Sequence, residues 1–198
     1  MRWALPGVLR GGERRTGFRT WLAAACHSGT VAGIELGTRP GRLVIAAAAL
    51  GSGMALLDGT VVNVALVRIG DELDASLADL QWITNGYLLA LASRILLGGS
   101  LGDHFGRRRV FVIGVIWFAI ASLACGLAQN SGQLIAARIL QGIGGALLTP
   151  GSLSIIQAVF RSEDRAKAIG AWSGLGGISA AIGPFVGGWL VEYASWRW

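Results

Sequence analysis

Residues 99–109 read Gly99-Ser100-Leu101-Gly102-Asp103-His104-Phe105-Gly106-Arg107-Arg108-Arg109, and the rest of the chain can be placed from this stretch. It joins two apolar segments, because residues 95–102 and 110–137 contain no charged side chain. Three consecutive arginines beside a membrane span tend to stay in the cytoplasm, since translocating their charge is unfavourable and the inner leaflet is anionic. The stretch therefore predicts a cytoplasmic turn between two membrane helices. A loop that only fixes the orientation of the helices in the membrane would explain these charges.

The composition is that of a membrane protein. Of the 198 residues, 53% are hydrophobic and 14% are charged, against about 25% charged in a typical soluble domain. Apolar runs reach the length of about 20 residues that a helix needs to cross a bilayer. We therefore expect an all-α membrane protein with five transmembrane helices, over about residues 43–67, 80–102, 110–127, 133–160 and 168–191.

Basic residues alternate between the two sides of these spans. Thirteen of the 17 lysine and arginine residues precede the first span or lie in the 102–110 and 160–168 connections. Only Arg68 and Arg197 fall on the opposite side, with an acidic cluster over residues 71–79. We therefore expect a multi-pass protein of the plasma (inner) membrane with a cytoplasmic N-terminus. No nucleic-acid partner is expected, because the arginines lie between apolar spans rather than along a polar face.

Residues 1–41 contain no apolar run long enough to span a membrane. We predict a disordered, basic cytoplasmic tail there and a transmembrane domain over residues 42–198. The two cysteines, Cys26 and Cys125, offer neither a disulfide framework nor a metal-binding spacing.

The first predicted span contains one carboxylate, in the stretch Leu57-Asp58-Gly59-Thr60-Val61-Val62-Asn63-Val64-Ala65-Leu66. An ionised carboxylate inside a bilayer costs roughly 3 kcal/mol on insertion scales. Asp58 has a short side chain and nine uncharged residues after it, so it cannot easily reach the interface. A carboxyl group buried in this way can take up and release protons. We predict that Asp58 couples the protein to protons.

The fourth predicted span contains an arginine, in the stretch Arg138-Ile139-Leu140-Gln141-Gly142-Ile143-Gly144-Gly145-Ala146. Arg138, Gln141, Gly142 and Gly145 share one helical face by their i, i+3, i+4 and i+7 spacing. An arginine in the membrane needs a partner, and the glycines let another helix come close. Backbone carbonyls alone could satisfy it. Counting roughly 1.5 Å per residue from the predicted outer span ends puts Asp58 and Arg138 at similar depths, so we predict a pair.

The fifth predicted span is rich in small residues. They recur four apart at Gly176, Ala180, Pro184 and Gly188, and again at Gly183 and Gly187. This spacing predicts a face for close helix packing that can also bend.

Together these patterns resemble the signatures of the major facilitator superfamily, in that family's order. The first stretch resembles the cytoplasmic loop between spans two and three, at Gly99, Leu101, Asp103, Gly106, Arg107 and Arg108. His104 stands where the family usually has a basic residue. The Asp58 stretch is similar to the first-span signature of the fourteen-span drug:proton antiporters (EmrB/QacA subfamily), with Val67 in place of its final proline.

The other two patterns extend the resemblance to residues 43–198. The Arg138 pattern, with Gly142 and Gly145, resembles the span-four signature, in which the arginine is linked to proton transfer. The pattern of Gly183, Pro184, Gly187 and Gly188 resembles the span-five signature of exporters. The resemblance thus implies an incomplete N-terminal half of a transporter, truncated before a sixth span.

The function implied by the resemblance is proton-coupled export of small hydrophobic or cationic compounds, drugs among them. The partners would be the bilayer, protons, the substrate and a missing C-terminal half, on which the Asp103 loop would act as a conformational switch. The alternative is a truncated protein that does not transport, or a half-transporter that needs a partner. An enzyme, a metal site or a cofactor is not expected, since no nucleophile–base set, metal cluster or phosphate loop occurs.

Arg94 departs from the pattern, because the resemblance implies an apolar residue there. It either faces a pore or marks a degraded sequence.

Overall fold

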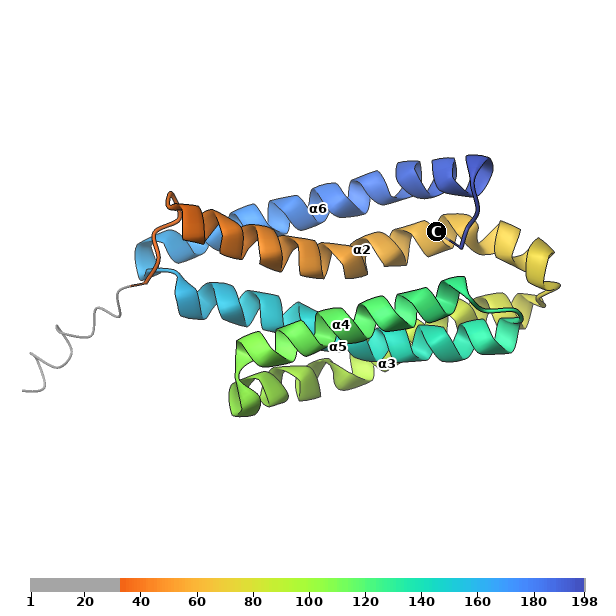
Figure 1. Cartoon of the computed structure of the whole chain (residues 1–198), viewed down its shortest axis with the longest axis horizontal. Coiled ribbons are helices and arrows are strands. Elements are labelled where there is room, and N and C mark those ends of the chain that lie inside the picture. Colours follow the sequence, from red (N-terminus) through yellow and green to blue (C-terminus); the bar gives the residue numbers. More distant parts are fainter. Residues whose placement is uncertain (1–32, 198) are drawn as a thin grey trace, which may run out of the picture. The chain divides into compact units, whose positions relative to one another are not determined.

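The computed structural model describes residues 33–197, and within that range the chain forms five long helices (Figure 1). They are α2 (Arg39–Leu73), α3 (Leu77–Phe105), α4 (Arg107–Gly126), α5 (Ser131–Val159) and α6 (Ser162–Tyr193). Most of the predicted tail, residues 1–32, lies outside the described residues, as does Trp198. The prediction of an all-α fold is confirmed.

Each helix contains one predicted span to within a residue, but extends beyond it. Helix α2 has 35 residues, which is roughly 50 Å of helix against a hydrocarbon core of about 30 Å. The added turns carry charged residues such as Arg39 and Glu72, so a prediction based on apolar runs ends too early.

Four of the described helices, α2, α4, α5 and α6, are long and apolar enough to cross a membrane by length and composition. Helix α3, predicted as the second span, is not among them. It carries Gln81, Asn85 and Arg94 among its apolar residues.

Local sequence explains where the helices begin and end. The side chain of Asn130 accepts a hydrogen bond from the backbone N–H of Gln133 at 2.9 Å, and Ser76 and Asp79 form a reciprocal capping box. The connection between α3 and α4 is Gly106 alone, whose φ of 96° favours glycine. The predicted turn over residues 99–109 is therefore helical except at Gly106. The charges and glycines of this stretch suggested a longer break between the two helices.

Helix α5 packs along both α3 and α4, while α2 packs along α6 and also contacts α5. Figure 1 shows α6 and α2 side by side along one edge, with α3, α4 and α5 grouped along the other. The middle of the core contains Tyr87, Phe111, Phe118 and Leu148, from α3, α4 and α5. Every connection is short, so successive helices run in opposite directions.

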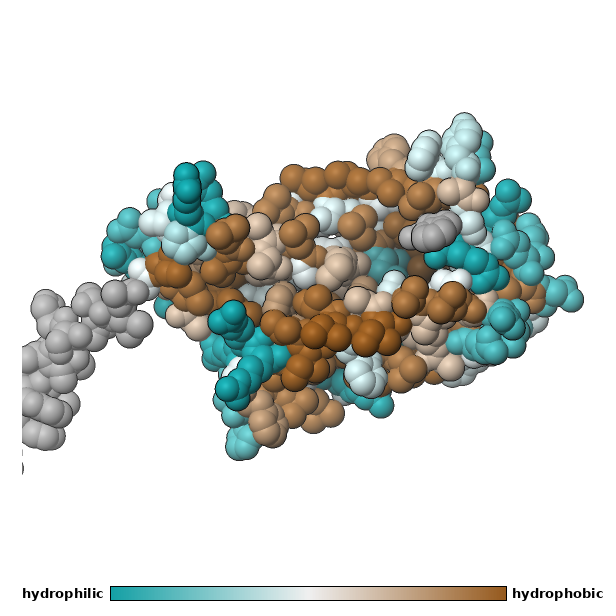
Figure 2. All heavy atoms as spheres, viewed as in Figure 1, coloured by the Kyte–Doolittle hydropathy of each residue, from teal (hydrophilic) through white to brown (hydrophobic). Residues whose placement is uncertain are grey.

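The surface has the hydropathy pattern of a membrane protein. Figure 2 shows hydrophobic residues over the middle of the helices and hydrophilic residues gathered at both ends. Large apolar side chains are exposed along this middle zone, including Leu50, Leu96, Ile120 and Phe185. Contact with lipid or with further protein would remove this apolar surface from water.

Glycines set the distance between α3 and α5. A Cβ atom added at Gly142 would overlap the carbonyl oxygen of Tyr87 and lie 2.9 Å from the Cβ of Ala90. One added at Gly145 would lie 3.2 Å from a methyl group of Leu91. Both glycines thus lie where α3 and α5 approach each other closely.

Gly142→Ala is expected to destabilise the helical bundle by about 1–3 kcal/mol, because the added methyl group meets backbone atoms that cannot rotate away. The measurement is the thermal unfolding midpoint of the purified chain in detergent. Gly177→Ala is the matched control, since a Cβ there has no neighbour within 4 Å. Equal midpoints for the two variants would contradict this view of the α3–α5 contact.

The packing face of α6 differs from the predicted one. Gly176, Gly183 and Gly187 are buried against Leu56, Thr60 and Val61 of α2. Pro184 is exposed and Gly188 is half-buried. Residues four apart rotate by about 40° per step around a helix of 3.6 residues per turn, so Pro184 and Gly188 leave the face that Gly176 begins.

Candidate functional site

Asp58 of α2 and Arg138 of α5 form an ion pair in the interior of the bundle. The Nη1 atom of Arg138 lies 2.6 Å from Oδ2 of Asp58. Arg138 is 2% exposed, and the side chain of Asp58 is 16% exposed. The two residues are 80 positions apart in sequence, so the contact depends on the packing of α2 on α5. The two side chains that were predicted to pair are thus in contact.

Gln141 connects the two charged groups. Its Nε2 donates to Oδ1 of Asp58 at 2.9 Å, and its Oε1 accepts from Nη1 of Arg138 at 2.7 Å. Gln141 is fully buried, and the thiol of Cys125 contacts the same amide oxygen at 3.5 Å. Because Gln141 contacts both partners, it restricts how each side chain is oriented.

Tyr87 of α3 completes the surroundings of Arg138. The guanidinium carbon lies 4.4 Å from the centroid of the Tyr87 ring, a cation–π distance. The Tyr87 hydroxyl donates to the carbonyl oxygen of Ala55 at 3.3 Å, which links α3 to α2. Nε of Arg138 donates to the carbonyl oxygen of Ile83 at 3.4 Å. A carboxylate, an amide, a ring and one carbonyl thus surround Arg138, so backbone carbonyls alone do not satisfy it.

Gln141 and Tyr87 were not among the predicted site residues. Its spacing already places Gln141 on the helical face of Arg138, one turn away, but does not assign it a role. Nothing in the sequence of α3 distinguishes Tyr87 from other aromatic residues. Its role depends on α3 approaching α5 closely at Gly142, which only the folded chain shows.

The charged loop makes a separate cluster at the α3–α4 junction. Arg107 lies 3.0 Å from Oδ1 of Asp103, one helical turn earlier, and its Nη1 donates to the carbonyl oxygen of Ser154 at 3.0 Å. An aspartate at this place can cap a helix N-terminus or pair with a basic residue, and Asp103 pairs with Arg107. Leu101 and Arg108 are exposed, and Gly99 is half-buried.

A family model described as Major Facilitator Superfamily matches residues 48–198. The chain belongs to the major facilitator superfamily.

Curated relatives of this superfamily member are named for resistance and export. The chain is 46% identical over 151 residues to the tetracenomycin C resistance and export protein of Streptomyces glaucescens, covering 76% of this chain and 28% of that protein. It is 43% identical over 155 residues to the methylenomycin A resistance protein of Bacillus subtilis, covering 78% and 33%. The multidrug transporter protein MdtP of Bacillus subtilis is 40% identical over 142 residues, covering 72% and 26%.

Solved structures agree with this assignment. A bacterial homologue of the human lysosomal transporter Spinster, in an inward-facing and occupied conformation, matches with a TM-score of 0.64 and 27% identity. The match covers 81% of this chain and 38% of that one. The chain thus spans between 26% and 38% of the length of these relatives and of the solved transporter.

Arg94 lies apart from the Asp58–Arg138 pair. It is exposed on α3, where its Nη1 donates to the hydroxyl of Ser93 at 3.4 Å. With Trp82, Leu89 and Ile139 it borders a shallow hollow between α3 and α5. No carboxylate of residues 33–197 forms an ion pair with it. The superfamily signatures give this residue no role.

Over residues 33–197, no group of three histidine, cysteine, aspartate or glutamate side chains is placed to hold a metal ion.

Proposed function

We propose that this superfamily member exports small hydrophobic or cationic compounds, drugs among them, in exchange for protons that bind to Asp58. The observation that carries the proposal is the Asp58–Arg138 ion pair, held between two helices long and apolar enough to cross a membrane. Ionisable residues inside membrane helices are costly, and pairs of them mark proton pathways in many transporters. Names of the relatives, which include resistance, export and multidrug transport, support the substrate class.

The pair offers a way for protonation to change how helices pack. Ionised Asp58 accepts from both Arg138 and Gln141. A proton on Asp58 removes its charge and leaves Arg138 without a counter-ion in a water-poor site, which is costly. Protonation would therefore weaken the link between α2 and α5 and favour another arrangement of the helices.

The finer assignment to the fourteen-span drug:proton antiporters belongs to this proposal, as does the switch role of the Asp103–Arg107 loop. Transport by alternating access needs a second helical bundle rocking against the first. We propose that the segments present in the longer relatives supply that bundle. The alternative is a protein that does not transport. No contact within residues 33–197 favours that alternative over export.

A chimaera tests the proposed function. The matching 151-residue segment of the tetracenomycin relative is replaced by the corresponding segment of this chain, and the protein is reconstituted in vesicles. An imposed proton gradient should drive efflux of a fluorescent cationic dye, and an ionophore that collapses the gradient should stop it. Correct insertion without gradient-dependent efflux would refute the proposal, provided the parent relative is active in the same vesicles.

The arginine-rich end of the bundle, with the start of α2 and the α3–α4 junction, is expected to face the cytoplasm. In a background lacking Cys26 and Cys125, a membrane-impermeant maleimide added outside intact cells should label Asp71→Cys. It should not label His104→Cys until the cells are opened. Both native residues are exposed, so burial does not bias the comparison. The opposite pattern would reverse the proposed orientation.

Tyr87→Leu is expected to alter the pH dependence of efflux by the chimaera, because Arg138 loses the ring that holds its guanidinium. Tyr87→Phe keeps the ring and loses only the hydroxyl bond to Ala55. Its pH profile should therefore remain close to that of the parent chimaera. Identical profiles for the Leu and Phe variants would show that the ring does not position Arg138.

A further inference from the structure

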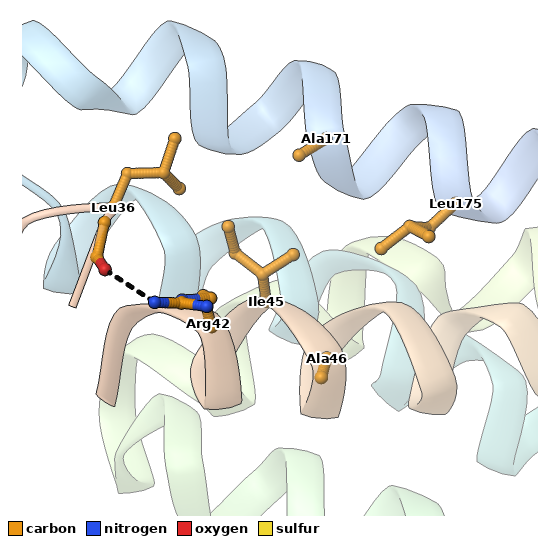
Figure 3. Close-up of a pocket in the computed structure, with 7 residues that line it drawn as sticks. Leu36, Arg42, Ile45, Ala46, Ala171 and Leu175 are labelled. Atoms are coloured by element: carbon orange, nitrogen blue, oxygen red, sulfur yellow. Dashed lines mark hydrogen bonds between the residues drawn. The ribbon is translucent and has the colours of Figure 1, made fainter. Parts of the chain in front are cut away.

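A hollow of about 480 Å³ opens between the beginnings of α2 and α6, at the end of the bundle that carries the excess of arginines (Figure 3). It is lined by Leu36, Gly37, Arg42, Ile45, Ala46, Ala171 and Leu175. All of these except Gly37 and Arg42 are apolar. Figure 3 shows Arg42 at the end of the hollow near Leu36, with Ile45, Ala46 and Leu175 further along the two helices. The hollow is thus charged at its outer end and apolar along its length.

Arg42 has most of its hydrogen-bonding capacity free for a ligand. Its Nη2 donates to the carbonyl oxygen of Gly37 at 3.2 Å. Among residues 33–197, no carboxylate lies within ion-pair distance of it. A guanidinium carries five N–H donors, which suit a phosphate group.

A second cation, Lys167, lies in the first two turns of α6. Lys167 is exposed and precedes Ala171 and Leu175 by four and eight residues, so the three share one side of the helix. The long side chain of Lys167 therefore begins one turn beyond Ala171, toward the same end of the bundle as Arg42.

The acidic residues near the starts of α2 and α6 have other contacts or form no ion pair with Lys167. Glu35 pairs with Arg161 at 2.6 Å, and Asp164 accepts from the backbone N–H of Leu36 at 3.1 Å. Glu163 is exposed one turn before Lys167 but forms no ion pair with it. The mouth of the hollow thus keeps a positive charge, and the bond to Asp164 holds its Leu36 wall in place.

We propose that this hollow binds an anionic phospholipid of the cytoplasmic leaflet. The phosphate would contact Arg42 and Lys167, and an acyl chain would lie along Ile45, Ala46, Ala171 and Leu175. A free anion would leave the apolar length unused, while a cationic drug would meet two like charges. The site has cations at the level of the lipid headgroups and apolar residues at the level of the acyl chains, as an anionic phospholipid requires. The site is independent of the proton pair and of the proposed export.

Native mass spectrometry of the purified 198-residue chain, released from detergent, tests the proposal. The probes are dioleoyl phosphatidylglycerol and dioleoyl phosphatidylcholine, which share acyl chains and differ in net charge. The chain should retain one phosphatidylglycerol in preference to phosphatidylcholine, and the preference should fall as salt is added. Equal retention of the two lipids would overturn the proposal.

Variants locate the site. Each surface cation near an anionic lipid contributes about a fivefold change in affinity. Arg42→Gln and Lys167→Gln should thus each weaken phosphatidylglycerol binding about fivefold, and the double variant more, while Arg42→Lys keeps the charge and most of the binding. Ala171→Trp should abolish binding by filling the hollow with both cations in place. Helical circular dichroism confirms that each variant is folded.

Arg109→Gln is the matched control, because it removes the same charge from the same end of the bundle. Arg109 lies at the start of α4, and Figure 1 shows the start of α4 apart from the beginnings of α2 and α6. A loss for Arg109→Gln as large as that for Arg42→Gln would show that general surface charge, not this hollow, retains the lipid. Displacement by glycerol 3-phosphate at equal concentration would identify a soluble anion site instead, and unchanged binding in Ala171→Trp would remove the hollow from the interaction.

Discussion

Asp58→Asn is expected to abolish proton-driven efflux by the chimaera while leaving its insertion and abundance intact. Asparagine has nearly the same shape, and its one carbonyl oxygen can still accept from Arg138 or Gln141, but it cannot take up a proton in the range in which cells maintain a gradient. The loss should be at least about 100-fold, because coupling needs a group that changes its charge. Efflux is measured in vesicles with an imposed gradient.

Asp71→Asn is the control for this substitution. Asp71 lies on the same helix but is exposed near its far end, outside the network around Arg138. This variant should pump like its parent. An Asp58→Asn protein that still moved dye against a concentration gradient would remove Asp58 from the mechanism, whatever its importance for packing. Dye exchange without a proton gradient could persist in Asp58→Asn, and that result would separate substrate passage from coupling.

Arg138→Ala is expected to shift the pH dependence of efflux. Nη1 of Arg138 lies 2.6 Å from Oδ2 of Asp58, so the substitution removes the charge that pairs with this carboxylate. The carbonyl band of a protonated carboxyl group in the infrared spectrum follows the protonation of Asp58 directly. The pH dependence of that band should differ between Arg138→Ala and its parent, and the band should disappear in Asp58→Asn.

Arg94→Ala provides the comparison, because it also removes an arginine from within a helix. Arg94 is exposed and bonded only to its neighbour Ser93 in the described residues. Its removal should leave both the infrared band and the pH profile unchanged. An unshifted profile in Arg138→Ala, or an equal shift in Arg94→Ala, would contradict a specific action of Arg138 on Asp58.

Much of the architecture could be predicted from the sequence, because membrane insertion depends mainly on local properties. Apolar runs of bilayer length placed all five helices, and the ionisable residues inside them identified both members of the ion pair. Helix ends were less accurate. The helices continue through charged residues such as Arg39 and Glu72, since a helix satisfies its own backbone in water as well as in lipid.

Two corrections to the prediction are local. The conformation of Gly106 makes the α3–α4 break a single residue, and the 3.6-residue period of α6 turns Pro184 away from α2. The remaining features depend on how the helices pack. Gln141 and Tyr87 entered the site only when α5 lay close to α2 and α3. The spacing of residues along one helix shows which of them share a face, but it does not show which other helix packs against that face. The approach of α3 to α5 at Gly142 is decided by tertiary contacts, and so is the ring that lies against Arg138.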